Sequence, residues 1–302
     1  MNGQLGIVGA SGFIGRELAR QAAEAGWVVH GFSRTERAAS GAIAHWREWT
    51  EAPDFAGLDA IVNLAGEPVN QRWTKARQRL FRDSRIGVTE RIAAGIGRLS
   101  GSGRPSVLVN ASAVGIYGNR GDELLDESSA PGCGYLADLC RDWEDAADRV
   151  AELGPRVLKW RIGIVLGRDG DAFRQMLIPF RLGLGGRLGS GQQWMPWIHV
   201  EDLAASILHG IGRSGLHGAV NGSSPQPERN IDFTRKLGAA LRRPALLPVP
   251  AIGLRALLGD FAGVILASQR VIPRVLLENE FHFRYPTLEL ALSDLLTSSS
   301  SS

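Results

Sequence analysis

The stretch GASGFIG, residues 9–15, decides the fold of this chain. It lies between a short apolar run and an amphipathic stretch, and its glycines follow the pattern G-x-x-G-x-x-G. Glycines at this spacing permit a tight turn from strand to helix and let the backbone approach a pyrophosphate at the helix N-terminus. A plain βα turn can carry the same pattern, but the flanking runs favour a dinucleotide-binding turn. The expected cofactor contacts here are Gly9, Ser11, Gly12, Phe13, Ile14 and Gly15.

Short apolar runs alternate with amphipathic stretches through the first half of the chain. Such alternation is typical of βαβ units around a parallel sheet. The expected strands are 5–9, 27–32, 60–65, 106–112 and 156–166. The expected helices are 13–26, 73–96, 135–153 and one beginning near 199–211, with two more near 267–278 and 287–296. We therefore predict an α/β fold with a doubly wound parallel sheet of the Rossmann type.

The rhythm changes after about residue 167, where Gly-rich turns such as GLGGRLGSGQ (183–192) begin. We expect an NADP-binding Rossmann domain over 1–166, to which residues 195–222 return. A smaller C-terminal α/β lobe is expected from 167–194 and 223–297. The serine run at 298–302 is of low complexity, so a disordered tail is expected there.

Composition and charge exclude several classes of function. The 31 arginines, against three lysines, are scattered among the acids and leave a net charge of +3, so no nucleic-acid partner is expected. No run reaches the roughly 18 apolar residues of a membrane span, and the N-terminus lacks a signal-peptide pattern, so no membrane partner is expected. Cys133 and Cys140 match no common metal pattern and suit a reducing cytoplasm, so no metal is expected.

The end of the second expected strand should select between NAD and NADP. An NAD site usually carries an acid there, which accepts hydrogen bonds from the ribose 2′-hydroxyl. This chain has Ser33 and Arg34, with no acid before them. A guanidinium forms paired hydrogen bonds with a 2′-phosphate and gains little from a bare hydroxyl. We expect NADP, with NAD less favoured; an ordinary surface arginine is the alternative.

Two further segments end expected strands at the same edge of the sheet. NLAGE (63–67) has small residues that allow a nicotinamide ribose to approach, and NASAVGIYG (110–118) has a serine hydroxyl. Ligands of open α/β sheets bind outside the carboxyl ends of the strands, so both segments are expected in the cofactor crevice. The expected cofactor contacts from them are Leu64, Ala65, Gly66 and Ala111.

Longer phrases of the sequence carry a family resemblance. GASGFIG, NLAGE, SAVGIYG and WIHVEDL resemble the extended short-chain dehydrogenase/reductase superfamily. RIGIVLGRDG, MLIPFRLGLGG and GSGQQWMPWIHVEDL resemble its atypical branch, the NAD-dependent epimerase/dehydratase family proteins. In that branch a short C-terminal domain of the DUF1731 type carries a segment like SQRVIPRVLLENEFHFRYPTLELAL (268–292). The resemblance covers about residues 4–296 and implies an extended Rossmann fold with a bound dinucleotide.

The chemistry of the superfamily transfers to this chain only in part. By resemblance, a serine and a tyrosine cooperate with a lysine four residues after the tyrosine, and the lysine lowers the tyrosine's pKa. Ser112 and Tyr135 match the serine and the tyrosine, but Leu139 stands where the lysine is expected. A phenol without such help has a pKa near 10 and is a poor base at neutral pH. Ser112 and Tyr135 are the catalytic candidates, and a role as a wall residue is the alternative for Tyr135.

Two arginines complete the expected cofactor set. By resemblance, Arg85 occupies a position in the long helix that points a polar residue into the cleft, and Arg161 ends a strand. The expected substrate contacts are Glu67, Arg72, Trp73, Tyr117, Gln192 and Trp197. Surface solvation is the alternative for Arg85, and a Glu–Arg pair that only fastens the loop is the alternative for Glu67 and Arg72. His199 precedes a helix and is more typical of a packing residue than of a base.

These observations favour an NADP(H)-dependent oxidoreductase or epimerase-like enzyme that acts on a small, unidentified substrate. A non-catalytic NADP(H)-binding sensor or regulatory protein is the first alternative. A nucleotide-sugar epimerase or dehydratase is the second, but Met195 stands where, by resemblance, such enzymes carry an arginine for the diphosphate. A homodimer through the 73–96 helix is a further option, because related folds use this helix as a dimer face.

Overall fold

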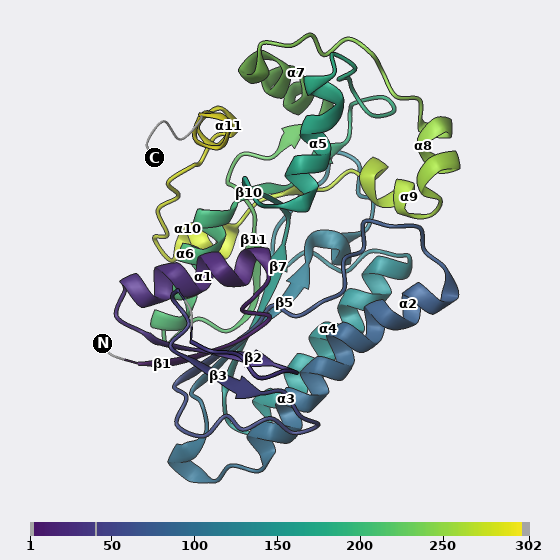
Figure 1. Cartoon of the computed structure of the whole chain (residues 1–302). Coiled ribbons are helices and arrows are strands. Elements are labelled where there is room, and N and C mark those ends of the chain that lie inside the picture. Colours follow the sequence, from purple (N-terminus) through teal and green to yellow (C-terminus); the bar gives the residue numbers. More distant parts are fainter. Residues whose placement is uncertain (1–2, 40, 298–302) are drawn as a thin grey trace.

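The fold is centred on a parallel sheet of seven strands in the order β11-β7-β5-β4-β1-β2-β3 (Figure 1). The structure is a computed structural model that describes residues 3–39 and 41–297. The strands are β1 (Gln4–Val8), β2 (Val28–Ser33), β3 (His45–Glu48), β4 (Ala60–Asn63), β5 (Val107–Ala113), β7 (Arg156–Ile162) and β11 (Gly218–Gly222). The chain moves outward from β1 in both directions, so the sheet is doubly wound and the predicted fold class is confirmed. The expected disordered tail, 298–302, lies outside the described residues.

Helices cover both faces of this sheet (Figure 1). They are α1 (Phe13–Glu24) with α6 (Val200–Gly212) on one face, and α3 (Val88–Gly97) with α4 (Tyr135–Ala151) on the other. The apolar residues of α1 recur at three- to four-residue spacing, as at Leu18 and Ala22, and this stripe is buried. Because both faces are covered, the central strands are apolar throughout, and all four residues of β4 are buried.

The predicted strand 156–166 is divided at Gly163. It forms β7 and then β8 (Ile164–Leu166), and β8 pairs with β10 (Trp197–His199) outside the main sheet. A Cβ on Gly163 would lie 2.8 Å from the carbonyl oxygen of Pro196, so only glycine lets the two segments approach here. Strands β3 and β11 were absent from the prediction, since β3 is polar and half-exposed and β11 contains two glycines.

The predicted helix 73–96 is three consecutive helical segments. They are α2 (Lys75–Arg82), a π-helical turn η1 (Asp83–Gly87) and α3. Thr74 begins α2 by accepting a hydrogen bond from the Arg77 backbone N–H. A π turn inserts an extra residue into the helical repeat, and such turns occur frequently at functional sites.

A smaller set of elements lies beyond the carboxyl edge of the sheet, at the top of Figure 1. It comprises α5 (Asp171–Arg181), β9 (Trp194–Met195), β12 (Glu228–Arg229), α7 (Asn230–Leu241), α8 (Ala251–Leu258) and α9 (Phe261–Leu266). The remaining elements are the 3-10 turns η2 (Gly101–Gly103) and η3 (Val114–Tyr117), β6 (Leu124–Leu125), β13 (Arg270–Val271), α10 (Arg274–Glu278) and α11 (Leu288–Leu296). The expected helix 267–278 is therefore only partly helical. Phe173, Trp197 and Phe233 are central in the apolar core of this part.

Within the described residues, no helix has the length and apolar character needed to cross a membrane.

Candidate functional site

The glycine turn leaves no room for larger side chains. A Cβ on Gly15 would lie 2.2 Å from the carbonyl oxygen of Gly9, and Gly9 itself has a φ of 88°. Gly12 caps α1, and its N–H donates a 3.0 Å hydrogen bond to Gly9. The first turn of α1 thus presents its backbone N–H groups with no side chain from Gly12 to cover them. This geometry fits the pyrophosphate of a dinucleotide.

Phe13 joins this turn to a later part of the chain. A Cβ on Gly167 would lie 2.3 Å from the Phe13 ring, and one on Gly170 would lie 2.9 Å from it. The turn that follows β8 therefore packs directly on the first residue of α1. Ser11 is exposed, and its carbonyl oxygen accepts a 3.0 Å hydrogen bond from Arg16.

The candidate selectivity residues lie at the carboxyl end of β2. Ser33 is its last residue, and Arg34 follows it with an exposed side chain. The strand β3 brings an acid to this edge, because Glu48 lies in register with Ser33. Sequence analysis did not weigh this acid, since β3 was not predicted.

Buried amides join the ends of β4 and β5. The side-chain amide of Asn63 donates to Asn110 Oδ1 at 2.7 Å, and Asn63 Oδ1 accepts from the Ala65 backbone N–H at 3.2 Å. Thr89 Oγ1 lies 3.2 Å from Asn110 Oδ1 and accepts a 3.1 Å hydrogen bond from the Trp143 indole N–H. These bonds hold the start of the 64–67 loop against the sheet edge and α3.

The π turn holds the other end of that loop. Ser84 Oγ accepts from the Glu67 N–H at 3.0 Å, and Arg85 Nη2 donates to the Glu67 carbonyl oxygen at 3.0 Å. A Cβ on Gly66 would lie 3.2 Å from the Arg85 guanidinium carbon, so the guanidinium packs closely against this glycine. The guanidinium also lies 5.3 Å from the Trp143 ring centroid, and burial lowers the pKa of Arg85. Both backbone groups of Glu67 are thus held by two successive residues of η1.

Ser112 enters a buried chain of polar contacts. Its hydroxyl donates to Glu144 Oε1 at 2.8 Å. Arg161, the register partner of Ser112 on β7, donates to the same carboxylate from Nε at 2.8 Å and from Nη2 at 2.9 Å. Burial alone would lower the pKa of Arg161, but its bonds to Glu144 outweigh burial and raise it. The serine therefore faces a carboxylate that is fixed from its other side by a guanidinium.

The buried series of polar contacts continues from Arg161 to Tyr117. Its hydroxyl accepts from Arg161 Nη1 at 2.9 Å and donates to Asn221 Oδ1 at 2.7 Å. The Asn221 amide in turn donates to the carbonyl oxygen of Ile272 at 2.9 Å. Burial raises the pKa of Tyr117 to about 12, and its side chain has no exposed surface. In this structure the phenol is an internal link between β7, β11 and the C-terminal segment.

The face of α4 toward Ser112 carries neither a tyrosine nor a lysine. A Cβ on Gly115 would lie 3.4 Å from Leu136 and 3.9 Å from the Cys140 sulfur, so these two residues face the 112–118 segment. Leu136, Cys140 and Glu144 follow one another at four-residue spacing on this face. Burial raises the pKa of the Cys140 thiol to about 12.

Tyr135 lies one residue before this stripe, about 100° around the helix. Its hydroxyl donates to the carbonyl oxygen of Gln78 on α2 at 3.0 Å, and burial raises its pKa. Its ring lies 5.2 Å from the Trp73 ring, and Trp73 in turn lies 6.3 Å from Phe261 of α9. The structure thus places Tyr135 in an aromatic wall, with its hydroxyl bonded away from Ser112.

The remaining substrate candidates lie in different environments. Trp197 is fully buried and donates to the carbonyl oxygen of Gln226 at 3.0 Å. Gln192 is exposed, and its carbonyl oxygen accepts from Arg229 at 2.6 Å. The Glu67 carboxylate lies 3.8 Å from Arg77, so its ion-pair partner is not the expected Arg72, which is exposed. The members of this set that retain solvent-accessible surface are Glu67, Arg72, Trp73 and Gln192. All the substrate roles stay predictions.

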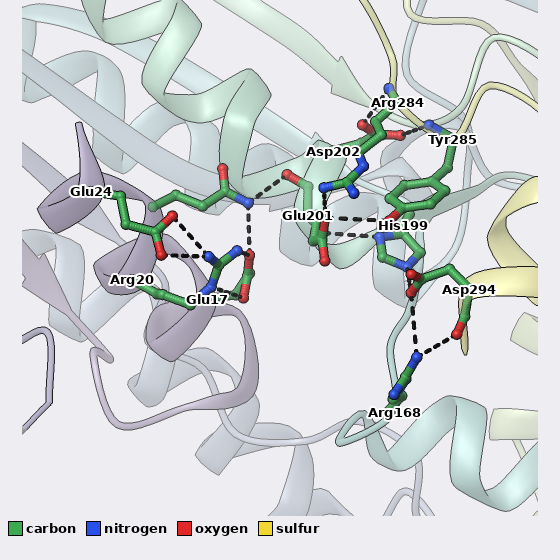
Figure 2. Close-up of polar contacts among 11 residues, drawn as sticks. Glu17, Arg20, Glu24, Arg168, His199, Glu201, Asp202, Arg284, Tyr285 and Asp294 are labelled. Atoms are coloured by element: carbon green, nitrogen blue, oxygen red, sulfur yellow. Dashed lines mark hydrogen bonds and ion pairs between the residues drawn. The ribbon is translucent and has the colours of Figure 1, made fainter. Parts of the chain in front are cut away.

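A second polar cluster fastens the C-terminal segment to α6, and Gln21 of α1 in turn donates a 3.0 Å hydrogen bond to the carbonyl oxygen of Glu201 on α6 (Figure 2). Asp202 accepts hydrogen bonds from the backbone N–H groups of Arg284 at 2.8 Å and Tyr285 at 2.9 Å. His199 caps α6, because its Nδ1 accepts from the Glu201 N–H at 3.2 Å. Its Nε2 therefore carries the proton and lies 3.4 Å from Asp294 Oδ2 of α11.

This cluster borders a cavity of ≈ 470 Å³ between α1, α6, α11 and the turn after β8. Burial lowers the pKa of His199 to about 4, although Asp294 opposes this shift. The arginines of the cavity face carboxylates: Arg20 lies 2.7 Å from Glu24, and Arg168 lies 4.0 Å from Asp294. The geometry supports the packing interpretation of His199.

Sequence analysis missed two features of the candidate site. Glu144 was not selected, because an acid in an amphipathic helix usually faces solvent; its spacing from Leu136 and Cys140 is the signal that was available. The π turn was not predicted, and DSRIG (83–87) contains no pattern that distinguishes it from an ordinary helical turn.

Comparisons with known proteins give a consistent family. The profile described as NAD dependent epimerase/dehydratase family matches residues 5–220, and the domain of unknown function DUF1731 matches residues 249–295. The Arabidopsis thaliana protein named epimerase family protein SDR39U1 homolog, chloroplastic, is 38% identical over 300 residues, which cover 96% of this chain and 86% of that protein.

Two solved structures extend the comparison. The crystal structure of human epimerase family protein SDR39U1 (isoform 2) with NADPH has a TM-score of 0.88 at 33% identity, and the match covers 97% of this chain and 98% of that one. The nucleoside-diphosphate sugar epimerase from Corynebacterium glutamicum has a TM-score of 0.78 at 29% identity. That match covers 98% of this chain but 58% of the other.

Proposed function

The chain belongs to the NAD dependent epimerase/dehydratase family, and from this premise we propose that it is an NADP(H)-dependent oxidoreductase acting on a small carbonyl or alcohol substrate. The family assignment and the C-terminal DUF1731 match confirm the resemblance seen in the sequence. Members of this family depend on NAD(P). We infer that the cofactor is NADP. We also infer a cytoplasmic location, which suits the free thiols of Cys133 and Cys140.

The glycine turn carries the cofactor part of the proposal. The space beside Gly15 excludes a Cβ, Gly9 has a positive φ that favours glycine, and the uncovered N-terminus of α1 favours an anion. Leu64, Ala65 and Gly66 would line the nicotinamide half, since they follow β4 at the same edge. When bound, the dinucleotide supplies or accepts the hydride. The residues of the chain bind it, orient it and manage the proton.

Two observations support NADP over NAD. Arg34 directly follows β2 with an exposed guanidinium, where it would reach a 2′-phosphate. The human relative at 33% identity was crystallised with NADPH. Glu48, in register with Ser33 on the neighbouring edge strand, is an acid at this edge that would favour a ribose hydroxyl instead.

The Ser112–Glu144 contact supports a role for the serine in proton transfer. The Ser112 proton is directed at Glu144, so the serine oxygen keeps its lone pairs for a hydrogen bond from a substrate hydroxyl. When hydride leaves the carbon of an alcohol substrate for NADP⁺, the hydroxyl proton would pass to Ser112 as the serine proton passes to Glu144. The carbonyl product, NADPH and a protonated carboxyl group then balance the step. Arg161 holds the carboxylate in place throughout.

A small substrate suits this site better than a nucleotide sugar. Met195 is buried, and its sulfur lies 3.2 Å from the Asn230 side-chain nitrogen, so it offers no charge to a diphosphate. Trp73, Tyr135 and Phe261 instead form an aromatic wall that joins α2, α4 and α9. Such a wall favours the apolar part of a small carbonyl compound.

One observation favours a non-catalytic NADP(H)-binding sensor as the second candidate. The positions of α4 that face the serine segment, Leu136 and Cys140, hold an aliphatic side chain and a thiol with a pKa of about 12. Neither side chain can exchange a proton with a substrate at neutral pH, and a protein that only binds the cofactor needs no such group.

Binding and turnover separate these candidates. NADPH fluorescence is titrated with purified protein, and a panel of aldehydes, ketones and alcohols is then screened for cofactor oxidation or reduction. The proposal expects saturable NADPH binding and turnover with at least one member, which Ser112→Ala abolishes and Tyr135→Phe preserves. Saturable binding without any turnover favours the sensor. Absence of binding contradicts both.

A further inference from the structure

The small lobe ends in an apex that is both basic and apolar. The apex comprises residues 178–190 and 242–257, which include the end of α5 and most of α8 at the top of Figure 1. A backbone hydrogen bond of 3.1 Å from Leu247 to Gly185 joins the two segments. A second backbone hydrogen bond, of 2.9 Å from Val249 to Arg187, confirms that the two segments lie side by side.

The most exposed large apolar side chains of the described residues gather on this apex. The four highest exposed fractions are those of Leu246 (81%), Ile252 (79%), Leu257 (72%) and Leu182 (68%). Ile178, Leu184 and Leu247 are exposed as well, so the apex holds seven of the twelve such side chains. Single exposed leucines are ordinary, but a concentration of this kind marks an interaction surface.

The charge of the apex has one sign. Its two segments contain five arginines and no aspartate or glutamate, in a chain whose net charge is +3. The exposed members are Arg181, Arg242, Arg243 and Arg255. None of the ion pairs among the described residues involves these four, whereas the nearby Arg174 and Arg235 each have an aspartate partner. The apex is therefore complementary to a partner that has both negative charges and an apolar interior.

We propose that the apex docks on the surface of a membrane that contains anionic lipids. Aliphatic side chains enter the boundary between headgroups and acyl chains, while arginines at the same depth meet lipid phosphates. This proposal departs from the sequence prediction of no membrane partner. That prediction rested on the lack of a spanning run and of a signal peptide, and surface docking requires neither. The protein would lie on the membrane surface without crossing it, and the arginine–phosphate contacts would be electrostatic.

Other occupants fit this surface less well. In a two-fold dimer the same patch meets itself, so the arginines of both copies would face each other. A nucleic-acid backbone would satisfy the arginines but would leave the aliphatic side chains without a function. Both occupants are therefore outcomes of the test.

Docking would hold the aromatic wall of Trp73, Tyr135 and Phe261 near the bilayer. The chain runs from α8 directly into α9, where Phe261 faces Trp73 of the aromatic wall. A Cβ on Gly259, between the two helices, would lie 3.6 Å from Arg72 Nε. The helical pair α8 and α9 thus joins the apex to Arg72 and Trp73, two of the predicted substrate contacts.

Vesicle binding tests the proposal with the full chain. The protein is sedimented with vesicles of phosphatidylcholine alone, or with phosphatidylglycerol added at about one part in four. The expected result is binding to the anionic vesicles and none to the neutral ones. Binding should weaken steeply toward ~1 M salt, where the Debye length falls to about 3 Å.

Substitutions on the apex give the second arm. Leu246→Asp with Ile252→Asp, and Arg242→Glu with Arg243→Glu, should each weaken binding about tenfold or more. Leu290→Asp on α11 and Arg98→Glu after α3 are matched controls, because both side chains are exposed away from the apex. Thermal melts followed by circular dichroism confirm that each variant folds, without reference to cofactor binding.

Several results would overturn the proposal. These are equal binding to neutral and anionic vesicles, absence of binding to either, and apex variants that bind as tightly as the wild type. A dimer in sedimentation experiments that the apex variants convert to a monomer would assign the surface to self-association. Tighter binding to duplex DNA than to anionic vesicles would assign it to nucleic acid.

Discussion

Ser112 donates a 2.8 Å hydrogen bond to Glu144, a carboxylate that lies 32 residues later in the chain and is buried with it. The contact joins the end of β5 to α4, the helix on which Tyr135 and Leu139 occupy the positions of the superfamily's tyrosine and lysine. The serine on β5 thus has an acidic partner on the helix that lacks the lysine.

Breaking this buried contact should cost stability. Glu144→Gln leaves Arg161 with its charge uncompensated, so the free energy of unfolding should fall by about 3 kcal/mol. The double variant Glu144→Leu with Arg161→Met should recover much of that loss, because no charge is then left buried alone. Urea denaturation of Glu144→Leu, Arg161→Met and the double variant that combines them measures the coupling. Additive losses would show that the two charges do not depend on each other.

Cofactor selectivity should depend on Arg34. Arg34→Ala removes the cation for the 2′-phosphate, so NADPH affinity should fall about tenfold to a hundredfold while NADH affinity stays constant. Fluorescence titration with both nucleotides measures this change. Arg37→Ala is the matched control, since the Arg37 guanidinium lies 5.1 Å from the Trp46 ring centroid. An increase in NADPH preference in Glu48→Gln with no change in Arg34→Ala would transfer the selectivity to β3.

The glycine turn should tolerate no methyl group at its third glycine. Gly15→Ala places a Cβ 2.2 Å from the carbonyl oxygen of Gly9, so the turn must shift. Unfolding free energy should fall by about 1–3 kcal/mol, and dinucleotide binding should be lost. Gly87→Ala is the control, because Gly87 has helical φ and ψ and its Cβ would contact nothing within 4 Å. That variant should be as stable as the wild type or more stable by up to about 1 kcal/mol.

Acid should weaken the fold through His199. Its pKa is about 4 in the folded chain and about 6.5 when unfolded, so the unfolded state takes up a proton between these values. Above pH 6.5 the neutral His199 makes its full contribution to the free energy of unfolding. This contribution, on the order of 1–3 kcal/mol, is lost as the pH falls toward 4. His199→Asn keeps a side-chain cap for α6 and removes the imidazole.

The comparison of the wild type with His199→Asn isolates this titration. Burial raises the pKa of Asp202 and Glu127, so their protonation works in the opposite direction in both proteins. The difference in urea midpoint between pH 7 and pH 4.5 should be larger for the wild type. Parallel pH dependence in the two proteins would exclude His199 as its source.

The parts of the fold with strong local signals could be predicted from the sequence. The glycine turn and the long apolar strands around it specify a doubly wound sheet, because both faces of such strands must be covered. The edge strand β3 has little apolar content, and β11 reads GAVNG, so neither carries a strand signal. Both form because the neighbouring strand offers hydrogen bonds, which is a tertiary effect.

The candidate site was less accessible to sequence reasoning. Ser112 follows from the end of β5, and its role in a proton step stays a prediction. Whether Tyr135 faces the serine depends on about 100° of helix rotation, the difference between one residue and the next. Spacing measured along the chain does not resolve such a difference. The partner of Ser112 lies on another element, so only the packed structure reveals Glu144.

The chain of contacts from Ser112 to Asn221 limits how this sequence can diverge. A descendant that replaced Arg161 alone would inherit an isolated carboxylate, and one that replaced Glu144 alone would inherit an isolated guanidinium. The two positions should therefore change together across a lineage or not at all. A gene tree in which they vary independently would mean that water or another side chain can take over either half of the pair.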